Sequence, residues 1–355
     1  MQYDLLAYIG RFQPYHLGHE LTIKEALKLA ERLVILVGSS NQPRTPKNPW
    51  TFIERVRMIQ GSLTQEELSR VSFEPLRDRP YNEDGWIEGV QRAIHKNRNG
   101  VKHVSLIGYT KDESSYYLKK FPQFGHVESP VKETINATDL REAYFKRHFM
   151  AGAPLYVPQN VLDYLKDFEQ SEDYLYVVNE QNYLDQHAKD WAFAPYDVPF
   201  AAGDAVVTQS GHILLIQRIK APGKGLWALP GGHLNLKTHK NKKGELVKAD
   251  MTFLDAAIRE LVEETQIDVM ETILRARVKE QKLFMHPDRS LRGRYITEAA
   301  YIPLEQHGKG LPKVKGTDDA LVAKWFTFAE FRKMEPFMFE DHFHIGCYFI
   351  DRGNF

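Results

Sequence analysis

The sequence contains a single cysteine, Cys347, among its 355 residues. One thiol cannot form an intramolecular disulfide, which excludes the small disulfide-stabilised secreted proteins and favours a reducing compartment. The chain also lacks any stretch approaching the ~18 consecutive apolar residues of a membrane span. Its first residues, MQYDLLAYIGRF, lack the basic and apolar segments of a secretory signal. We therefore expect a cytoplasmic protein with no membrane partner.

An excess of charge of one sign is missing as well. Lys+Arg and Asp+Glu both total 47, so the formal net charge is zero. No long-range field then favours nucleic acid, and any phosphate site must be built locally. What is present is an ordinary globular composition, with 43% apolar and 12% aromatic residues. Because one domain typically has ~100–200 residues, this length predicts two domains.

Strand-like and helical segments alternate through the first half of the chain. Alternation of this kind predicts a doubly wound parallel sheet covered by helices on both faces, an α/β fold. Ligands of such sheets bind beyond the carboxyl ends of the strands. The expected strands are 3–9, 33–40, 71–76, 104–109 and 126–130, and helical spacing occurs at 20–33 and 85–97.

A change of pattern separates the two halves. Residues from about 151 to 191 are polar and tyrosine-rich with helical spacing, and we interpret them as a closing helix and a linker. Strand-like runs return after Val198, with a hairpin turn at 209–211 and an amphipathic helix at 253–265. The second domain is therefore expected to be α+β. The predicted domains are 1–185 and 196–355, and the basic run 237–248 is expected to be a solvated loop.

The sequence His16-Leu17-Gly18-His19 follows the first strand and opens a helix. This placement puts two imidazoles and several unpaired backbone N–H groups where a polyphosphate would bind. A helix-capping or solvent-exposed histidine pair is the alternative interpretation.

Several segments of the first half, in this order, resemble the nucleotidylyltransferases, and more narrowly the archaeal-type nicotinamide-mononucleotide (NMN) adenylyltransferases. They are GRFQPYHLGH (10–19), the pair Gly38-Ser39, TPKNPWTFIER (45–55), LIGYTKDESSYY (106–117) and INATDLREAY (135–144). The resemblance implies attack of the NMN phosphate on the α-phosphorus of ATP, giving NAD and pyrophosphate without a covalent intermediate. It also implies Mg²⁺, held mainly by the triphosphate and water.

The resemblance assigns roles to individual residues. The implied catalytic residues are His16, His19 and Arg141, and the implied ATP and phosphate contacts are Gly10, Arg11, Phe12, Gly38, Ser39, Lys47 and Thr138. Two positions depart from the family pattern. Lys47 stands where the family often has arginine, and Asn136-Ala137 replaces a Ser-Ser or Ser-Gly pair.

Recognition of nicotinamide needs an aromatic face and a hydrogen-bonding group for the carboxamide. Asp78, Asn82 and Trp86 match the base-binding segment of the family in residue type, with a spacing about one residue longer. The alternative is that Trp86 only packs in the core at the head of its helix.

A second constellation lies on the amphipathic helix. Glu260, Glu263 and Glu264 are spaced i, i+3 and i+4, so their carboxylates share one helical face. Like charges this close repel unless an arginine or a divalent cation compensates them, and oxygen ligands suit Mg²⁺ or Mn²⁺. A solvated acidic face is the alternative.

Together with LWALPGGHL (226–234), the run REL-x-EE at 259–264 resembles the Nudix box. The segment 286–301 and Trp227 resemble the Nudix half of bifunctional adenylyltransferase/ADP-ribose pyrophosphatases. This implies hydrolysis of ADP-ribose to AMP and ribose 5-phosphate by metal-activated water. Glu260 and Glu264 are the implied catalytic residues.

The resemblance also implies a metal site and a substrate site. Glu260, Glu263 and Glu264 would bind Mg²⁺, with Mn²⁺ as the alternative, and Arg259 would brace their carboxylates. Arg218 and Gly232 would contact the substrate. The arginines at 289, 292 and 294 would meet the diphosphate or form ion pairs, and either Glu280 or Asp288 would be the general base.

Three departures from the box keep another function open. Met251 replaces a glutamate, Gln266 replaces a glycine, and 18 residues separate Gly232 from Met251, which makes 237–248 an insertion. They favour a non-catalytic sensor of ADP-ribose or NAD, whereas the intact REL-x-EE favours a hydrolase. In the first domain, the alternative acceptors are phosphopantetheine and nicotinate mononucleotide. The expected partners are thus ATP, NMN and ADP-ribose, with a homo-oligomer left open.

Overall fold

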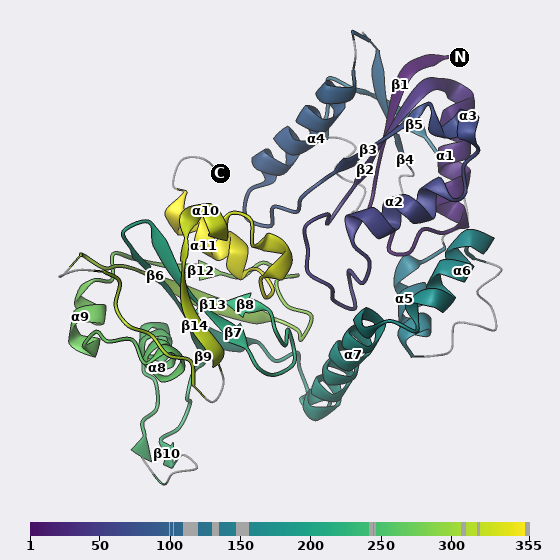
Figure 1. Cartoon of the computed structure of the whole chain (residues 1–355). Helices are drawn as coiled ribbons and strands as arrows, with labels where there is room; N and C mark the ends of the chain where they lie inside the picture. Colours follow the sequence, from purple (N-terminus) through teal and green to yellow (C-terminus); the bar gives the residue numbers. More distant parts are fainter. Residues whose placement is uncertain are drawn as a thin grey trace. The chain divides into compact units, whose positions relative to one another are not determined.

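The computed structural model describes residues 1–98, 100–101, 103–108, 120–129, 135–146, 156–240, 244, 246–306, 310–317 and 320–351. Most of the motif at 106–117, the start of the segment from 151, and part of 237–248 lie outside these residues. The chain divides into two compact units, unit 1 (Met1–Gln181) and unit 2 (Asn182–Phe355) (Figure 1). In the described ranges, no helix is both long enough and apolar enough to cross a membrane.

Unit 1 is built on a sheet of five parallel strands in the order β3-β2-β1-β4-β5. The doubly wound parallel sheet expected from the sequence is therefore confirmed. The strands are β1 (Tyr3–Gly10), β2 (Ala30–Val37), β3 (Val71–Pro75), β4 (Val104–Gly108) and β5 (Gly125–Glu128).

Helices cover both faces of this sheet, because alternate residues of each central strand are apolar on opposite sides. Leu6 and Ile35 pack with α1, α2, α5 and α6, whereas Leu5 and Val34 pack with α4. The helices are α1 (Leu17–Leu29), α2 (Phe52–Gln60), α3 (Gln65–Leu68), α4 (Glu83–Asn97), α5 (Ala137–Phe145), α6 (Gln159–Phe168) and α7 (Glu172–Trp191), whose last residues belong to unit 2.

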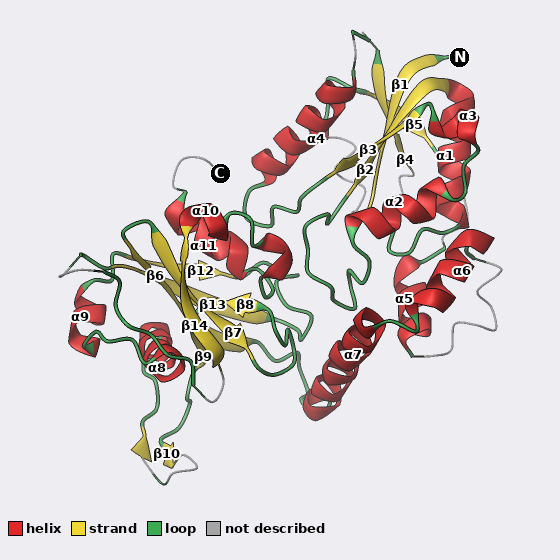
Figure 2. Ribbon diagram, in the orientation of Figure 1, coloured by secondary structure: helices red, strands yellow, loops and turns green. Residues whose placement is uncertain are grey.

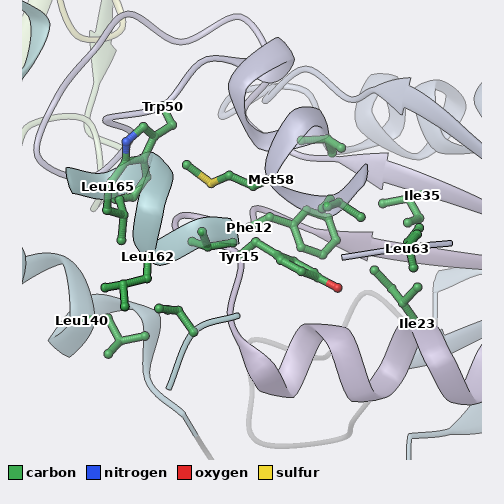
Figure 3. Packing of buried hydrophobic residues seen from close by; sticks show 14 of the residues in the cluster. Phe12, Tyr15, Ile23, Ile35, Trp50, Met58, Leu63, Leu140, Leu162 and Leu165 are labelled. Carbon is green, nitrogen blue, oxygen red and sulfur yellow. The ribbon is translucent and has the colours of Figure 1, made fainter. Parts of the chain in front are cut away.

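The loop that joins β1 to α1 is anchored in the core of unit 1. Phe12 and Tyr15, two of its residues, are fully buried in the cluster that also contains Ile35 and Met58 (Figure 3). Phe12 adopts a positive φ of 53°, which turns the chain sharply after the strand. The loop therefore holds a fixed path at the carboxyl edge of the sheet.

Unit 2 contains a mixed sheet in the order β12-β13-β6-β7-β14, with β8 paired to β7 and β9 to β6 (Figure 2). Strands β13 and β6 are parallel, and the other pairs are antiparallel. The strands are β6 (Phe200–Gln209), β7 (His212–Arg218), β8 (Trp227–Ala228), β9 (Gly231–His233), β12 (Glu280–Phe284), β13 (Tyr295–Pro303) and β14 (Ala320–Thr327).

The two faces of this sheet are also covered by helices, so the α+β expectation for the second domain is confirmed. Ala300 of β13 faces a cluster with Leu261 of α8, whereas the neighbouring Tyr301 stacks on Phe349 of α11 at 5.4 Å between centroids. The helices are α8 (Phe253–Thr265), α9 (Glu271–Ala276), α10 (Phe328–Phe331) and α11 (His342–Ile350), with a short 3-10 helix at Glu335–Phe337.

Two predicted local features can be compared directly with the structure. The hairpin turn between β6 and β7 is confirmed, with φ of 47° at Ser210 and 74° at Gly211, as two-residue hairpins require. The basic run 237–248 is not only a loop. Its described residues include a short antiparallel pair, β10 (His239–Lys240) and β11 (Leu246–Val247), whose residues are mostly exposed.

Candidate functional sites

The histidine pair of unit 1 lies at the start of α1, directly after the anchored loop. Nδ1 of His16 accepts from the backbone N–H of His19 at 3.4 Å, and Nδ1 of His19 accepts from that of His16 at 3.3 Å. The rings stack with centroids 3.6 Å apart. Capping, the alternative interpretation, therefore occurs, but it uses only the Nδ1 atoms. A neutral ring with Nδ1 as acceptor carries its proton on Nε2, where it can donate to an anion.

Burial lowers the pKa of His19 well below its ordinary value, and the neighbouring His16 lowers it further. The ring is therefore neutral at physiological pH, in keeping with the tautomer that the Nδ1 contact requires. Phe12 and Tyr15 surround it, with ring centroids 4.8 and 6.0 Å from that of His19. The aromatic loop residues thus fix the orientation of this imidazole.

Two arginines implicated by the sequence lie close to each other at this edge. Nη1 of Arg141 donates to the carbonyl of Gln13 at 2.6 Å, and Nη2 donates to Thr138 Oγ1 at 3.1 Å. Burial lowers the pKa of Arg141 to about 10, and the charge of the exposed Arg11 acts in the same direction. The positive charges of Arg11 and Arg141 repel each other, and an anion bound between them would relieve this repulsion. The two arginines therefore suit a polyphosphate.

The departure at 136–137 has a local explanation. Asn136 is the N-cap of α5, and its Oδ1 accepts from the backbone N–H of Thr138 at 3.0 Å. An asparagine is among the preferred residues at this position. The helix start that presents Thr138 and Arg141 is therefore stable without the hydroxyl that the family often has there.

Arg55 is a functional candidate that the sequence reasoning missed. Its guanidinium is buried and donates to the carbonyls of Arg11 (2.6 Å), Gly38 (2.6 Å) and Ser39 (3.1 Å). These carbonyls belong to the segments that follow β1 and β2, and Ser39 has a positive φ of 49°. Burial lowers the pKa of Arg55 to about 10. The signal was an arginine at i with Met58 and Ile59 at i+3 and i+4, on the buried face of α2.

The glycines expected at the phosphate site differ in their surroundings. A Cβ on Gly10 would lie 2.8 Å from Cζ of Phe12, so only glycine fits there. At Gly38 the nearest side-chain atom would be Arg11 Cγ at 3.5 Å, an ordinary contact. The backbone N–H of Gly38 donates to the carbonyl of Gly10 at 2.8 Å, which places the ends of β1 and β2 side by side. Lys47 is partly exposed in the segment between β2 and α2.

The three residues expected to bind nicotinamide lie between β3 and the first turn of α4. Asn82 is the N-cap of α4, with its Oδ1 accepting from the backbone N–H of Gly85 at 2.8 Å. Trp86 is half-buried, and its ring lies 6.1 Å from that of Phe121. Burial lowers the pKa of Arg55, and the charge of Asp78 opposes that shift. The Trp86 side chain is thus supported by the core without being enclosed by it.

In unit 2, α8 presents the three glutamates beside the Gly231–His233 strand. Glu264 is 8% exposed, and its Oε2 accepts from the backbone N–H of Gly231 at 3.0 Å. A Cβ on Gly232 would overlap the carboxylate of Glu260, so a larger residue there would displace that carboxylate. Glu263 is exposed. Nη1 of Arg259 donates to Glu260 at 2.8 Å and to Glu263 at 3.2 Å.

The electrostatics of these glutamates fit a divalent cation. Burial raises the pKa of Glu264 well above its ordinary value, and repulsion from Glu260 raises it further. Burial also raises the pKa of Glu260, although Arg259 opposes that shift. Among the residues with described positions, no three His, Cys, Asp or Glu side chains already converge as a ligand set. The oxygen donors and their unfavourable burial nevertheless match a hard cation.

Asp204 of β6 is a second residue that the sequence reasoning missed. It is 4% exposed, its Oδ2 accepts from Thr297 Oγ1 at 2.7 Å, and its charge contributes to the raised pKa of Glu264. A Cβ on Gly231 would overlap its carboxylate. Its signal was a lone acid inside the apolar strand run AAGDAVV (201–207).

The arginines proposed for the diphosphate fall into two groups. Arg289 forms a buried ion pair with Asp341 at 2.8 Å, and Arg292 pairs with Glu340 at 3.1 Å. The ion-pair alternative therefore holds for both, although these pairs are buried rather than on the surface. The Arg218 guanidinium carbon lies 4.0 Å from the ring centroid of Phe339, and its charge lowers the pKa of Glu264. Of the arginines proposed for the diphosphate, Arg218 is thus the one whose charge acts on Glu264.

The two general-base candidates lie on β12 and in the turn after it. Oε1 of Glu280 accepts from the Tyr348 hydroxyl at 3.4 Å. Asp288 is exposed, and its backbone N–H donates to His286 Nδ1 at 3.2 Å. The carboxylates that act on the pKa of Glu264 are instead Glu260 and Asp204.

The altered positions of the box leave the helix intact. Gln266 is the C-cap of α8 in the left-handed conformation, with φ 43° and ψ 39°. A glycine would adopt this conformation without strain, whereas another residue is destabilised there by ~1–2 kcal/mol. The α8 helix therefore ends in a left-handed cap even without the glycine. Met251 is 86% exposed, so its side chain does not enter the site.

Comparison with known proteins assigns both units to families. A cytidylyltransferase-like model matches residues 7–143, and a NUDIX domain model matches residues 199–345. A bifunctional NMN adenylyltransferase/ADP ribose pyrophosphatase from Francisella tularensis, crystallised with AMP and a Mn ion, is 31% identical to this chain. Its TM-score is 0.85, and the match covers 99% of both chains. The chain belongs to this bifunctional family.

The relatives that match the first unit are also mononucleotide adenylyltransferases. The nicotinamide/nicotinic acid mononucleotide adenylyltransferase of Acinetobacter baylyi is 39% identical over 174 residues, which is 49% of this chain and 90% of that protein. The nicotinamide-nucleotide adenylyltransferase of Saccharolobus solfataricus is 49% identical over 136 residues, 38% of this chain and 75% of that protein. Family membership confirms the resemblance and the fold class inferred from the sequence.

Proposed function

We propose that this chain is a bifunctional enzyme of NAD metabolism. Unit 1 transfers the adenylyl group of ATP to NMN, giving NAD and pyrophosphate, and unit 2 hydrolyses ADP-ribose to AMP and ribose 5-phosphate. The observation that carries the proposal is the 31% identity to a bifunctional enzyme over 99% of the chain. Both constellations of residues lie within the part of this chain that the match covers.

In unit 1, the catalytic groups are donors and cations rather than nucleophiles. The Nε2–H groups of His16 and His19 and the N-terminus of α1 face charge that grows on the phosphates, and Arg11 and Arg141 neutralise it. Gly10, Phe12, Gly38, Ser39, Lys47 and Thr138 complete the ATP contacts. Rate enhancement then comes from holding the two nucleotides in line and from fixed electrostatic stabilisation.

For the acceptor, Trp86 offers a half-buried ring on which nicotinamide can stack, with Asn82 and Asp78 nearby for the carboxamide. A hydrophilic acceptor such as phosphopantetheine has no ring for Trp86, which favours a pyridine mononucleotide. The Acinetobacter baylyi relative is named for both nicotinamide and nicotinic acid mononucleotides. Nicotinate mononucleotide is therefore the second acceptor to test.

In unit 2, Glu260, Glu263 and Glu264 are the proposed ligands of a divalent cation, which we expect to be Mg²⁺, with Mn²⁺ as a substitute. The bound cation supplies a Lewis acid that activates water and neutralises the diphosphate. Arg218 contacts the diphosphate, and Gly232 leaves space for the Glu260 carboxylate. Arg259 holds Glu260 and Glu263 in place.

The sensor alternative is not favoured. It rested on Met251, Gln266 and the insertion, but Gln266 reproduces the left-handed helix end, and Met251 lies in solvent. The buried carboxylates that a hydrolase needs are retained on α8. We accordingly propose turnover rather than binding alone.

The further expectations remain proposals. They are domain limits of 1–185 and 196–355, a cytoplasmic location, and small-molecule partners without nucleic acid or membrane, with a homo-oligomer left open as before.

The decisive experiment incubates the purified chain with Mg²⁺ or Mn²⁺ and each candidate substrate, followed by chromatographic separation of nucleotides. We expect NAD and pyrophosphate from ATP with NMN, and AMP from ADP-ribose only when a divalent cation is present. Nicotinate mononucleotide and phosphopantetheine serve as competing acceptors. Binding of ADP-ribose without release of AMP would contradict the hydrolase half of the proposal.

A further inference from the structure

The carboxylate of Asp250 accepts hydrogen bonds from Arg259, the arginine that contacts Glu260 and Glu263 of α8. Asp250 Oδ2 accepts from Arg259 Nη2 at 2.9 Å, and its Oδ1 accepts from Nε at 3.3 Å. The Asp250 side chain is 6% exposed and that of Arg259 is 18% exposed. A two-point, largely buried contact of this kind fixes the plane of a guanidinium as well as its position.

The opposite edge of the same guanidinium faces the proposed metal ligands. Nη1 donates to Glu260 and Glu263, and Nη2 also donates to the carbonyl of His233 at 3.0 Å. The Arg259 guanidinium therefore contacts Asp250 on one edge, the carbonyl of His233 in β9, and the two glutamates on the other edge. Its orientation depends on all of these contacts.

Met251, which stands where the Nudix box usually has a glutamate, cannot make this contact with Arg259. The Met251 side chain is 86% exposed, and its backbone N–H donates to Asp255 Oδ2 at 3.2 Å. Asp250, one position earlier, is the residue that turns inward.

Asp250 also closes the base of the inserted segment. Its Oδ2 accepts from the backbone N–H of Asn235 at 2.7 Å, and its own N–H donates to the Asn235 carbonyl at 2.9 Å. One carboxylate thus joins the two ends of the segment 236–249 and connects them to α8 through Arg259.

We infer that Asp250 is a positioning residue for the metal-binding glutamates and takes the place of the glutamate that the box lacks at position 251. This inference rests on the proposed hydrolase function. Its physical basis is charge sharing. With the Asp250 carboxylate on its other edge, Arg259 has a counter-charge of its own. Without that counter-charge, the guanidinium is drawn to Glu260 and Glu263 and competes with the cation for their oxygens.

A purely structural role for Asp250 makes a different prediction, and the isosteric variant separates the two. Asp250→Asn keeps an oxygen that accepts from the Asn235 N–H, so the base of the insertion stays closed, but it removes the negative charge behind Arg259. Asp250→Glu keeps the charge with a longer side chain. Met251→Glu restores the family residue in sequence, where the structure directs it into solvent.

The experiment compares these full-length variants by ADP-ribose hydrolysis at varied Mg²⁺ and by calorimetric binding of Mn²⁺ alone, with Glu264→Gln as the binding baseline. NAD synthesis and the melting temperature serve as controls for folding. Removing a residue that orients metal ligands typically costs ~10–100-fold in metal affinity or activity. We expect Asp250→Asn to weaken Mn²⁺ binding and lower kcat by about tenfold or more. The KM for ADP-ribose, the melting temperature and NAD synthesis should change little.

Asp250→Glu should recover part of the loss, and Met251→Glu should behave as wild type. Unchanged Mn²⁺ affinity and kcat in Asp250→Asn would overturn the inference while leaving the hydrolase proposal standing. Restoration of Asp250→Asn by an added Met251→Glu would also overturn it, because position 251 would then reach the site. If wild type hydrolyses no ADP-ribose, the proposed function fails, and the Mn²⁺ measurement still decides the role of Asp250.

Discussion

His16 and His19 cap each other: each Nδ1 accepts the backbone N–H of the other residue, and the two rings stack 3.6 Å apart. Because these contacts fix both protons on Nε2, the pair is a double donor without being charged. Donors held in position before the substrate binds need no reorganisation when negative charge develops on a phosphate.

His19→Ala should therefore slow NAD synthesis by about a hundredfold or more, while ADP-ribose hydrolysis continues, since the two constellations lie in separate units. A loss of ~3 kcal/mol of transition-state stabilisation is the expected scale for one such donor. Chromatography of both reactions checks this, with His19→Asn as the control that retains a capping oxygen. Recovery of synthesis in His19→Asn would mean that His19 serves only as a cap.

The lowered pKa of His19 makes the stability of unit 1 dependent on pH. The unfolded chain binds the proton near the ordinary pKa of 6.5, and the folded chain binds it only at lower pH. The contribution of neutral His19 is then complete above about pH 6.5 and is lost as the pH falls through the folded-state pKa. Melting temperatures of wild type and His19→Gln should converge or cross between pH 7.5 and about 5. A difference independent of pH would refute this assignment.

Arg55→Lys should destabilise unit 1 and slow NAD synthesis. A single ammonium cannot reach the carbonyls of Arg11, Gly38 and Ser39 together, and buried carbonyls left unpaired cost ~1–3 kcal/mol each. Chemical denaturation and steady-state kinetics measure the two effects. The exposed Arg57 on the same helix supplies the matched control, because Arg57→Lys should change neither. Equal behaviour of the two variants would remove Arg55 from the site.

Trp86→Ala should raise the KM for NMN more than the KM for ATP, because stacking of a base on an aromatic side chain contributes ~1–3 kcal/mol. Trp86→Phe should recover much of the difference. The ring also packs near Phe121, so a fall in melting temperature is expected alongside. Equal increases in both constants would support a purely structural role for the ring.

Glu264→Gln should eliminate metal-dependent hydrolysis of ADP-ribose and spare NAD synthesis. Most substitutions of buried residues lower the melting temperature, whereas this one should not. Glutamine resembles the protonated carboxyl that the raised pKa favours, so without metal the variant should melt at or above the wild-type temperature. Adding Mg²⁺ or Mn²⁺ should then stabilise wild type and not the variant. A variant less stable than wild type in EDTA would contradict this account of Glu264.

Local patterns predicted the elements and the motifs, because their signals lie within a few residues. The alternating strands and helices of unit 1, the hairpin turn at Ser210 and Gly211, and helix α8 over 253–265 were all visible in this way. The same applies to the glutamates, whose shared face follows from helical spacing alone.

What escaped prediction depends on contacts between distant parts of the chain. The charge of Asp204 acts on Glu264 only because β6 pairs with β9 and packs on α8. Arg55 donates to the carbonyl of Gly38 only because α2 returns to the end of β2. In the sequence, Asp204 is one acid in an apolar strand run, and Arg55 is one charged residue on the buried face of α2. Asp250 was harder still to predict. The spacing of the Nudix box places the partner of Arg259 at position 251, one residue after Asp250.

The closed base of the insertion also has a use in protein engineering. Asn235 and Asp250 hold the two ends of the segment 236–249 together, so material added beyond them does not have to be ordered by α8. Each doubling of a flexible loop costs only ~0.6 kcal/mol in closure entropy. The segment 236–249 should therefore accept a peptide tag or a small fluorescent domain. The enzyme would then carry an internal reporter close to the Nudix helix while both of its termini stay unmodified.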